Sequence, residues 1–338
     1  MPVKQGKYTL SLPSVPSVAG YAAVVGKKEG EGPLGAGFDY VYDDAAAGQK
    51  SWEKAESTMH GDAVNRALTK AGVTADEVDV AFAGDLLDQC IGSSFALRDS
   101  GMPFVGLYGA CSTMALSLAA AAVCVDARIA DIAVASTSSH FCSAEKQFRM
   151  PLEYGGQRTP TAQWTATAAG AAVISRADSK AKIDKVIIGR ICDYGVKDAN
   201  NMGAAMATAA VDTILRYFDE SGRDAEDFDC IVTGDLGAEG KEIAEVLLKK
   251  CGFDPKGRLT DCGMLIFDRE KQDVNAGGSG CGCSATVTAS HFYPRLRSGE
   301  LHDMLLIGTG ALLSPKTVLQ KESIPSVAHL VHLRRTQK

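Results

Sequence analysis

Residues 104–125 read FVGLYGACSTMALSLAAAAVCV, a short apolar run, two small residues and then a long run rich in alanine. The run 104–108 predicts a strand, Gly109-Ala110 a tight turn, and Cys111 the first residue of a helix. This helix carries no charge and no polar face, which indicates a helix buried on all sides in a large protein. It is too short to cross a bilayer, which takes about 20 residues.

The chain repeats itself on either side of this stretch. The helix-like segment 62–72 and the later triplet at 84–86 (GDL) recur 150 positions further on, at 212–222 and 234–236. Each segment leads through a short acidic turn to an apolar strand. The chain therefore predicts two related halves, and not one unrepeated domain.

The repeat continues through the motif itself. Ala110-Cys111-Ser112 matches the sequence at 282–284 (GCS), and the strand from Asp131 matches the one from Asp303, now 172 positions apart. The helix and strand alternation predicts the α/β class, with a mixed sheet covered by helices in each half. We expect an N-terminal half at 1–178 and a C-terminal half at 179–338.

Composition restricts the functions to consider. The 338 residues are 46% hydrophobic with a net charge of -6, and no basic run offers a nucleic-acid patch. The N-terminus lacks the apolar segment of a signal peptide, so we expect a cytosolic chain. Ten cysteines lack paired CxxC spacing, which predicts reduced core cysteines without structural zinc. We expect no cofactor and no nucleic-acid partner.

A long segment at 138–164 separates the halves and shows no clear period. Loops of this length in compact domains are usually functional covers or disordered. Its aromatic and charged residues favour an ordered cover over a site.

Cys111 is the candidate centre of that site. A thiol at a helix N-terminus meets unpaired backbone donors and the positive end of the helix dipole, which lower its pKa. The same donors can hold an oxyanion or a carboxylate. The alternative is that Cys111 is one more small buried hydrophobic residue.

At this point a resemblance becomes specific. The motif at 109–112 (GACS), the duplicated halves and the glycine-rich 277–282 (GGSGCG) resemble the thiolase and ketoacyl synthase superfamily. That resemblance implies a layered α-β-α-β-α fold. Further motifs resemble the stage V sporulation protein AD family of spore formers, which is implicated in moving dipicolinic acid into the developing spore. They are GPLG (32–35), QKSWE (49–53), AGDLL (83–87), SSH (138–140), QFR (147–149), EYGGQ (153–157) and GALLSP (310–315).

The resemblance also implies that this chain lacks the residues that support the catalytic cysteine in condensing enzymes. Enzymes of the superfamily support their cysteine with His or Asn from the second half. The matching positions carry Asp235, Cys283 and Leu306. An anionic Asp235 would raise the thiol pKa and repel an oxyanion. His140 could substitute as a donor, whereas His291 fits a structural histidine better.

A dianionic pyridine needs donors for two carboxylates and a flat wall for its ring. We expect the helix start at Cys111 and Ser112, with Arg149 and His140, to supply donors. Tyr154 or Trp164 would supply the flat surface. Each also has a plainer interpretation: Arg149 as an ion pair, His140 as a hydrogen-bonded core residue, the aromatic residues as core or dimer packing.

Three functions remain open from the sequence. The first is a binding protein for dipicolinic acid that works as a homodimer with membrane proteins of the spore uptake complex. It would lie in the forming spore, peripheral to the inner spore membrane through its partners. The second is a thioester-dependent acyltransferase that uses Cys111. The third is a structural subunit with an empty pocket.

Overall fold

The computed structural model describes residues 1–148 and 158–336. Its strands are β1 Val3–Gln5, β2 Thr9–Ser11, β3 Ser17–Val25, β4 Tyr40–Val41, β5 Val80–Gly84, β6 Phe104–Gly106, β7 Ile132–Ser139, β8 Trp164–Thr165, β9 Ala168–Ser175, β10 Ala181–Ile187, β11 Cys230–Thr233, β12 Leu259–Asp261, β13 Gly278–Ser279, β14 Asp303–Ala311 and β15 Ser326–Arg335. Its α-helices are α1 Lys27–Gly30, α2 Trp52–Ala71, α3 Ile91–Leu97, α4 Thr113–Asp126, α5 Phe141–Phe148, α6 Met202–Ser221, α7 Gly237–Lys250, α8 Cys262–Leu265, α9 Cys281–Val287, α10 Tyr293–Ser298 and α11 Pro315–Leu319. The short 3-10 turns are η1 Gly35–Gly37, η2 Ala75–Glu77, η3 Asp88–Cys90 and η4 Ala225–Asp227, and η5 Thr288–Phe292 is a π-helical turn.

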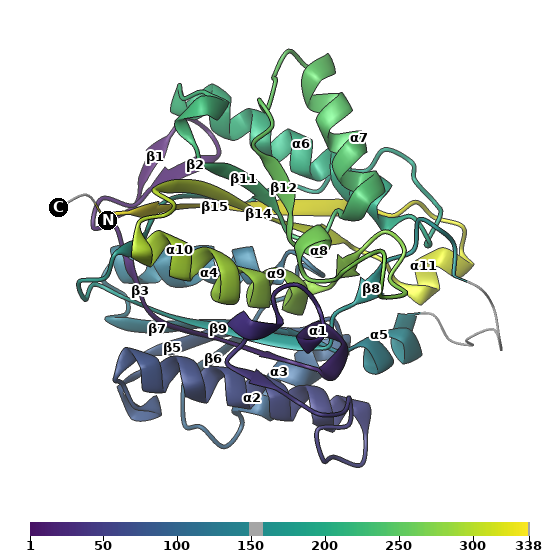
Figure 1. The fold of residues 1–338 in the computed structure, drawn as a ribbon. Coiled ribbons are helices and arrows are strands. Elements are labelled where there is room, and N and C mark those ends of the chain that lie inside the picture. Colours follow the sequence, from purple (N-terminus) through teal and green to yellow (C-terminus); the bar gives the residue numbers. More distant parts are fainter. Residues whose placement is uncertain (149–157, 337–338) are drawn as a thin grey trace.

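Two sheets lie face to face with helices between and outside them (Figure 1). One sheet has the order β6-β5-β7-β9-β3, and the other has the order β12-β11-β14-β15-β10. A single pairing, Lys182 with Ser17, connects β10 to β3. Helices α2 and α3 cover the outer face of the first sheet, α6 and α7 that of the second, and α4 and α9 lie between the sheets. The predicted α/β class and the five layers are confirmed.

The repeat seen in the sequence is visible in the elements. Helix α6 begins and ends 150 positions after α2, and β11 begins 150 positions after β5. Each sheet mixes parallel pairs next to β5 or β11 with antiparallel pairs next to β9 or β15. The exact division of the chain at residue 178 stays a prediction.

The two long outer helices end in the same way because their caps also repeat. Ser51 accepts a hydrogen bond from the Lys54 N–H at the start of α2, and Asn201 caps α6 in the same manner. Gly72 and Gly222 follow the helices with φ values of 70° and 65°, a left-handed conformation that glycine adopts at little cost. Local signals therefore set the length of these helices.

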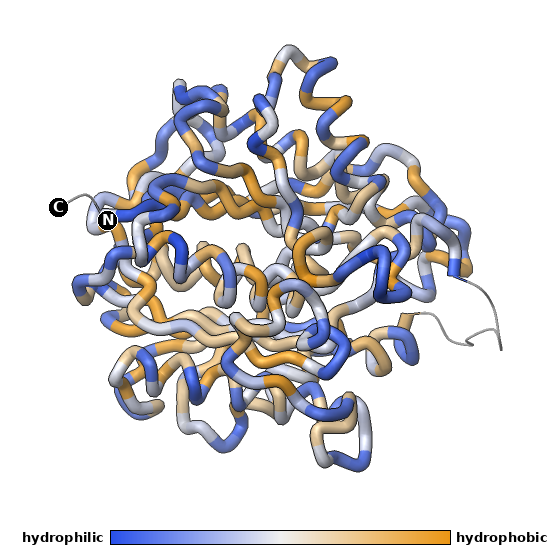
Figure 2. Tube along the Cα trace, viewed as in Figure 1, coloured by the Kyte–Doolittle hydropathy of each residue, from blue (hydrophilic) through white to orange (hydrophobic). Residues whose placement is uncertain are grey.

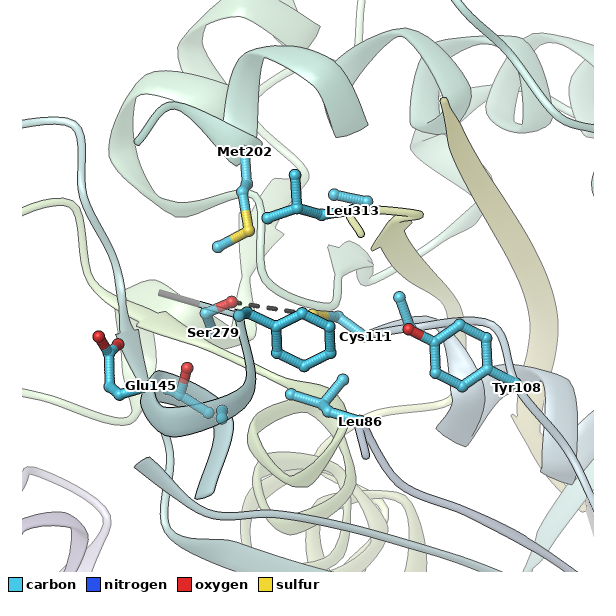
Figure 3. Close-up of a pocket in the computed structure, with 12 residues that line it drawn as sticks. Leu86, Tyr108, Cys111, Glu145, Met202, Ser279 and Leu313 are labelled. Carbon is cyan, nitrogen blue, oxygen red and sulfur yellow. Dashed lines mark hydrogen bonds between the residues drawn. The ribbon is translucent and has the colours of Figure 1, made fainter. Parts of the chain in front are cut away.

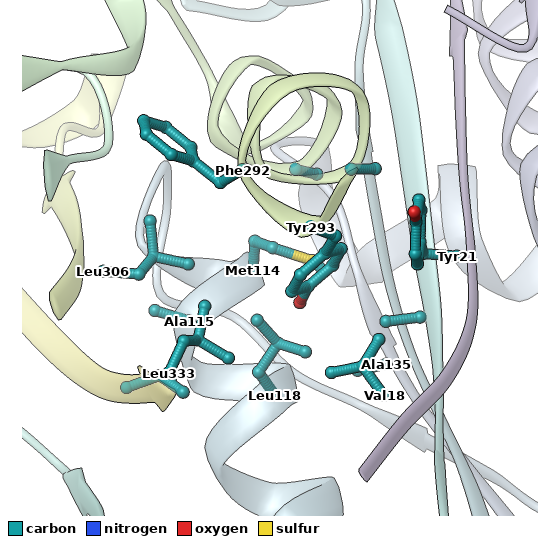
Figure 4. Packing of buried hydrophobic residues seen from close by; sticks show 14 of the residues in the cluster. Val18, Tyr21, Met114, Ala115, Leu118, Ala135, Phe292, Tyr293, Leu306 and Leu333 are labelled. Atoms are coloured by element: carbon teal, nitrogen blue, oxygen red, sulfur yellow. The ribbon is translucent and has the colours of Figure 1, made fainter. Parts of the chain in front are cut away.

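The central layer contains the largest core cluster. Met114 and Leu118 on α4 pack against Tyr293 at the start of α10 and against residues of both sheets (Figure 4). Small side chains let the layers approach closely: a Cβ at Gly308 on β14 would lie 2.7 Å from the Ala115 Cβ. Hydrophobic residues accordingly concentrate in the inner layers (Figure 2). Within the described residues, no helix is both long and apolar enough to span a membrane.

The segment between the halves was predicted to be an ordered cover over the site. The stretch 138–164, which shows no clear period in the sequence, contains α5, an eight-residue helix that begins two residues after β7 ends. Helix α5 lies at the edge of the layers beside β8 (Figure 1). The segment therefore places a regular helix, and not only a loop, next to the candidate site.

Candidate functional site

The turn before α4 sets the position of Cys111. Gly109 and Ala110 turn the chain after β6, and Ala110 has a φ of 50°. Ser112 Oγ donates to the Gly109 carbonyl at 2.6 Å, and Thr113 Oγ1 donates to the Ala110 carbonyl at 2.6 Å. Helix α4 begins at Thr113 and not at Cys111 as predicted, because these hydroxyls hold the preceding residues in turns. The predicted strand at 104–108 is likewise shorter and ends at Gly106.

The same turns use backbone donors that were expected to face a ligand. The Ser112 N–H donates to the Gly109 carbonyl at 3.1 Å, and the Thr113 N–H donates to the Ala110 carbonyl at 3.2 Å. Ser112 thus directs both its hydroxyl and its amide back into the chain. In this conformation the start of α4 offers a carboxylate fewer free donors than the sequence predicts.

A buried acid stands behind the cysteine. Ser279 Oγ lies 3.8 Å from Cys111 Sγ and donates to Asp235 Oδ2 at 3.0 Å. The same oxygen accepts from the Gly280 N–H at 2.9 Å, and Thr309 Oγ1 donates to Asp235 Oδ1 at 2.8 Å. Asp235 is fully buried. Its hydrogen bonds fix the carboxylate next to the thiol, as the sequence comparison predicted.

This arrangement keeps the thiol protonated. Burial raises the pKa of Cys111 well above its usual range, and the neighbouring Asp235 raises it further. Burial also raises the pKa of Asp235, although the hydrogen bonds that it accepts from Cys111, Gly280, Thr309 and Ser279 oppose this. A protonated thiol is a poor nucleophile.

A small cavity opens beside Cys111 (Figure 3). Its volume is about 40 Å³, enough for a few water-sized groups. Of the described residues that line it, Glu145 alone has a formally charged side chain, and most of the others are apolar. The lining comes from both halves of the chain and from α5. It comprises Leu86, Tyr108, Ala110, Cys111, Ala144, Glu145, Phe148, Thr165, Met202, Ser279, Ala311 and Leu313.

His140 does not reach this cavity, contrary to the prediction. Its Nε2–H donates to the Ala45 carbonyl at 2.7 Å, and its Nδ1 accepts from the Cys142 N–H at 3.1 Å. Burial lowers the pKa of His140, so the ring is neutral. Because both ring nitrogens are occupied, His140 holds the start of α5 in place and is not free to bind a ligand.

Cys283 and Trp164 are also placed differently from their predicted roles. Cys283 is buried in the central core, because α9 begins two residues earlier at Cys281, and it is Cys281 that packs with Cys111. Trp164 stacks on Phe141 with 3.7 Å between ring centroids. Lys28 lies over the same Trp164 ring at 3.7 Å, so the indole is already covered.

Of the three remaining predicted residues, the structure describes only His291. Arg149 and Tyr154 lie outside the described residues. His291 lies in η5, where its Nε2 is 3.0 Å from Arg295 Nη1, which fits the structural role expected for it.

Several lining residues escaped the sequence analysis. Ser279 stood inside the glycine-rich motif but was not singled out, although its place before Gly280, with a φ of 98°, marks a sharp turn. Glu145 and Phe148 lie on α5, which the sequence did not predict. Met202 and Leu313 carry no local signal, because only the packing of the two halves brings them to Cys111.

Several solved structures share the fold of this chain. The chain matches 3-oxoacyl-[acyl-carrier-protein] synthase III from Aquifex aeolicus VF5 with a TM-score of 0.59 and 12% identity, over 94% of this chain and 99% of that one. It matches a variant of OleA from Xanthomonas campestris with a TM-score of 0.61 and 13% identity, over 95% of this chain and 98% of that one. These likenesses show a thiolase-like fold and nothing about activity.

The sequence comparisons give the family. The family model for stage V sporulation protein AD matches residues 6–334. Stage V sporulation protein AD of Bacillus subtilis (strain 168) is 46% identical over 317 residues, which cover 94% of this chain and 93% of the relative. The chain therefore belongs to the stage V sporulation protein AD family.

Proposed function

We propose that this chain binds dipicolinic acid and supports its uptake into the developing spore, together with membrane proteins. The observation that separates this proposal from acyl transfer is the Asp235 carboxylate behind Cys111, held by Ser279, Gly280 and Thr309. An acid at this position opposes acyl transfer but leaves a pocket between the two halves. The choice of ligand is the one that the resemblance to the family implies.

The pocket is narrow, and widening would ease the entry of a ring with two carboxylates. Helix α5 forms one wall through Ala144, Glu145 and Phe148, and Phe148 is its last residue. A movement of α5 would enlarge the pocket without disturbing either sheet. A cation for the second carboxylate would come from Arg149, directly after α5.

An acyltransferase remains the second candidate because of one observation. The cavity walls are formed largely by apolar side chains such as Leu86, Met202 and Leu313, which suit an acyl chain, and Cys111 lies at their centre. The raised pKa of Cys111 argues against it. A structural subunit with an empty pocket would show neither binding nor acylation.

Two measurements separate these functions. Calorimetry with dipicolinic acid should show binding, and benzene-1,3-dicarboxylic acid, which lacks the ring nitrogen, serves as the matched control ligand. Incubation with an acyl thioester followed by intact mass measurement should leave the chain unmodified. An acyl adduct that Cys111→Ala abolishes would establish the enzyme instead, and neither binding nor adduct would favour the structural subunit.

The proposed assembly is a homodimer on the inner spore membrane, attached through its partners. Strand β6 lies at the end of its sheet in the described part of the chain, and Phe104 and Val105 on it are exposed. Tyr108, just beyond β6, is exposed and also lines the cavity. Pairing of two β6 edges would cover these side chains and help to close the pocket.

A further inference from the structure

A network of hydrogen bonds between buried polar side chains connects α2 to the start of α5. Glu56 and His60 lie about one turn apart on α2 and are almost fully buried. His60 Nε2 is 2.8 Å from Ser136 Oγ, and its Nδ1 is 3.1 Å from Ser138 Oγ. Ser138 Oγ is 3.1 Å from Glu56 Oε1, while Ser143 Oγ on α5 is 2.7 Å from Glu56 Oε2.

The hydrogen bonds around Ser143 are compatible with a protonated Glu56. Ser143 Oγ lies 2.7 Å from Glu56 Oε2 and also 3.1 Å from the His140 carbonyl oxygen. A hydroxyl has one proton and cannot donate fully to two acceptors. If Glu56 carries a proton on Oε2, it donates to Ser143, and Ser143 donates to His140.

The hydrogen bonds around His60 are also satisfied when Glu56 is protonated. His60 Nδ1–H donates to Ser138 Oγ, and Ser138 donates to Glu56 Oε1. His60 Nε2 then accepts from the Ser136 hydroxyl. Every proton has one acceptor when Glu56 and His60 are both neutral. An ionised Glu56 that accepts the Ser143 proton is also satisfied, because the His140 carbonyl already accepts from the Ala144 N–H at 3.0 Å. The surroundings of Glu56 decide between the two states, and they favour the neutral one.

The charged and titratable groups around Glu56 agree with this. Asp85 accepts from the Leu87 N–H at 2.9 Å, from the Ser93 N–H at 2.7 Å and from the Ser93 hydroxyl, so it is the better-stabilised anion of the pair. Burial, and then Asp85, raises the pKa of Glu56 to about 8.

The other titratable neighbours do not reverse this. Glu53, one turn earlier on α2, raises the pKa of Glu56 further, whereas the hydroxyls of Ser143 and Ser138 lower it. Burial lowers the pKa of His60 to about 4, so this ring stays neutral. Cys281, which faces Glu56 from α9, is a protonated thiol because burial raises its pKa.

The contact between Glu56 and Ser143 is a buried polar attachment of α5 to the first half. At the exposed surface, α5 is also held by the ion pair of Lys146 with Glu53 at 2.6 Å and the hydrogen bond of Gln147 with Asp88 at 2.9 Å, but exposed pairs contribute little to stability. Apolar packing of Ala144 and Phe148 in the Cys111 cluster adds to these contacts and does not depend on pH. A change in the protonation of Glu56 therefore acts on α5 through its buried polar attachment.

We propose that Glu56 is a neutral carboxylic acid that donates its proton to Ser143 and thereby holds α5 closed over the Cys111 pocket. Loss of that proton leaves a second anion beside Asp85 in the core, which is costly without water or a cation. Withdrawal of α5 exposes Glu56 to water and relieves that cost. Closure of the pocket is thus coupled to the protonation of Glu56. The role of this closure in ligand entry rests on the proposed function.

The stacked pair of Phe141 and Trp164 gives a direct readout. Phe141 is the first residue of α5, and its ring lies 3.7 Å from that of Trp164. The chain has two tryptophans, so Trp52→Phe isolates the Trp164 fluorescence. In the full chain with this substitution, Trp164 fluorescence is measured at pH values below and above 8. Backbone amide hydrogen exchange of residues 141–148 is measured over the same range and corrected for the intrinsic exchange rate.

The opening constant of α5 should rise by up to about tenfold per pH unit as pH approaches 8 from below, and then level off. Glu56→Gln retains an acceptor for Ser138 and a donor for Ser143 at every pH, so it should abolish this dependence. Ser143→Ala removes the attachment and should speed exchange in α5 at every pH. A Glu56→Gln chain with the same pH profile as the unmodified chain would overturn the proposal.

A second measurement covers the case in which Glu56→Gln does not fold. Exchange of α5 in the unmodified chain must then depend on pH below 8, and a flat profile would overturn the proposal on its own. None of these measurements uses a ligand. If the chain fails to bind dipicolinic acid but α5 still opens in a Glu56-dependent way, the proposed function is rejected. The proposal that protonated Glu56 holds α5 closed is then retained.

Discussion

Ser279 donates its hydroxyl proton to Asp235 Oδ2 at 3.0 Å, although Ser279 lies on β13 and Asp235 lies in the loop after β11. The same hydroxyl is 3.8 Å from the sulfur of Cys111. Ser279 therefore lies between an acid and a thiol, and it presents its oxygen lone pairs and not its proton to the sulfur. Burial and Asp235 raise the pKa of Cys111, whereas the hydrogen bond with Ser279 lowers it, so Cys111 reactivity is a sensitive test of the site.

The first prediction concerns that reactivity. Cys111 should react slowly with iodoacetamide at neutral pH, more slowly than the exposed Cys251 in the same chain. Asp235→Asn removes the negative charge and should lower the Cys111 pKa by about 1 to 3 units. Since a weaker base is also a weaker nucleophile, the alkylation rate should rise by roughly three- to thirtyfold. Peptide mass mapping after timed alkylation measures both rates.

Asp261→Asn is the matched control for this prediction. Asp261 is a second buried acid of the same half and accepts hydrogen bonds from Thr233, Leu236 and Gly237, but it does not contact the cavity. Its substitution should leave the Cys111 rate nearly unchanged. Rapid, selective alkylation of Cys111 in the unmodified chain would contradict the prediction and revive the acyltransferase.

The second prediction concerns the ligand. Arg149→Ala should weaken binding of dipicolinic acid by roughly 1.5 to 3 kcal/mol, the usual range for a hydrogen bond to a charged group, without unfolding the chain. Cys111→Ala should cost much less, because a protonated thiol contributes little to an anion. Calorimetry measures both. Unchanged affinity in a folded Arg149→Ala chain would remove this residue from the site.

The repeat made much of the fold predictable from the sequence. A shift of 150 positions carries the bounds of α2 onto those of α6, because caps and apolar faces are local signals. The buried helix α4 was likewise recognisable from its alanine-rich composition. Its first residue was not, since the hydroxyls of Ser112 and Thr113 extend the turn by two residues.

The site was less predictable because long-range contacts assemble it. Ser279 reaches Cys111 across 168 positions, and the direction of its hydroxyl depends on Asp235. His140 has the chemistry of a ligand-binding residue, yet Ala45, far away in the sequence, occupies one of its nitrogens. Residue type gave the candidates, but only packing decides which donors remain free.

The third prediction is a pH dependence of stability. Burial raises the pKa of Glu29 from 4.5 to about 7. A carboxyl group whose pKa is higher in the folded state stabilises the fold fully below its unfolded pKa, and this contribution is lost as pH rises through its folded pKa. The free energy of unfolding should therefore fall between about pH 4.5 and 7 by up to roughly 3 kcal/mol from this residue.

Glu29→Gln should remove that part of the slope in urea unfolding measured across this pH range. Buried histidines act in the opposite direction at lower pH. Burial lowers the pKa of His329 from 6.5 to about 4, so its contribution is present above pH 6.5 and is lost as pH falls through about 4. An unchanged slope in a folded Glu29→Gln chain would show that Glu29 is not protonated on folding.

The last prediction is the homodimer through the β6 edge. Val105 lies in the middle of β6 with 41% of its surface exposed, at the end of the sheet order in the described part of the chain. Light scattering at micromolar concentration should give twice the mass of one chain. Val105→Asp places a charge on each edge at the dimer axis, where like charges repel and lose water, and should yield monomers.

Val246→Asp is the matched control, because Val246 is 46% exposed on α7, on the outer face of the other sheet. It should leave the dimer intact. A monomeric unmodified chain would contradict the dimer, whereas a dimeric Val105→Asp chain would place the interface elsewhere.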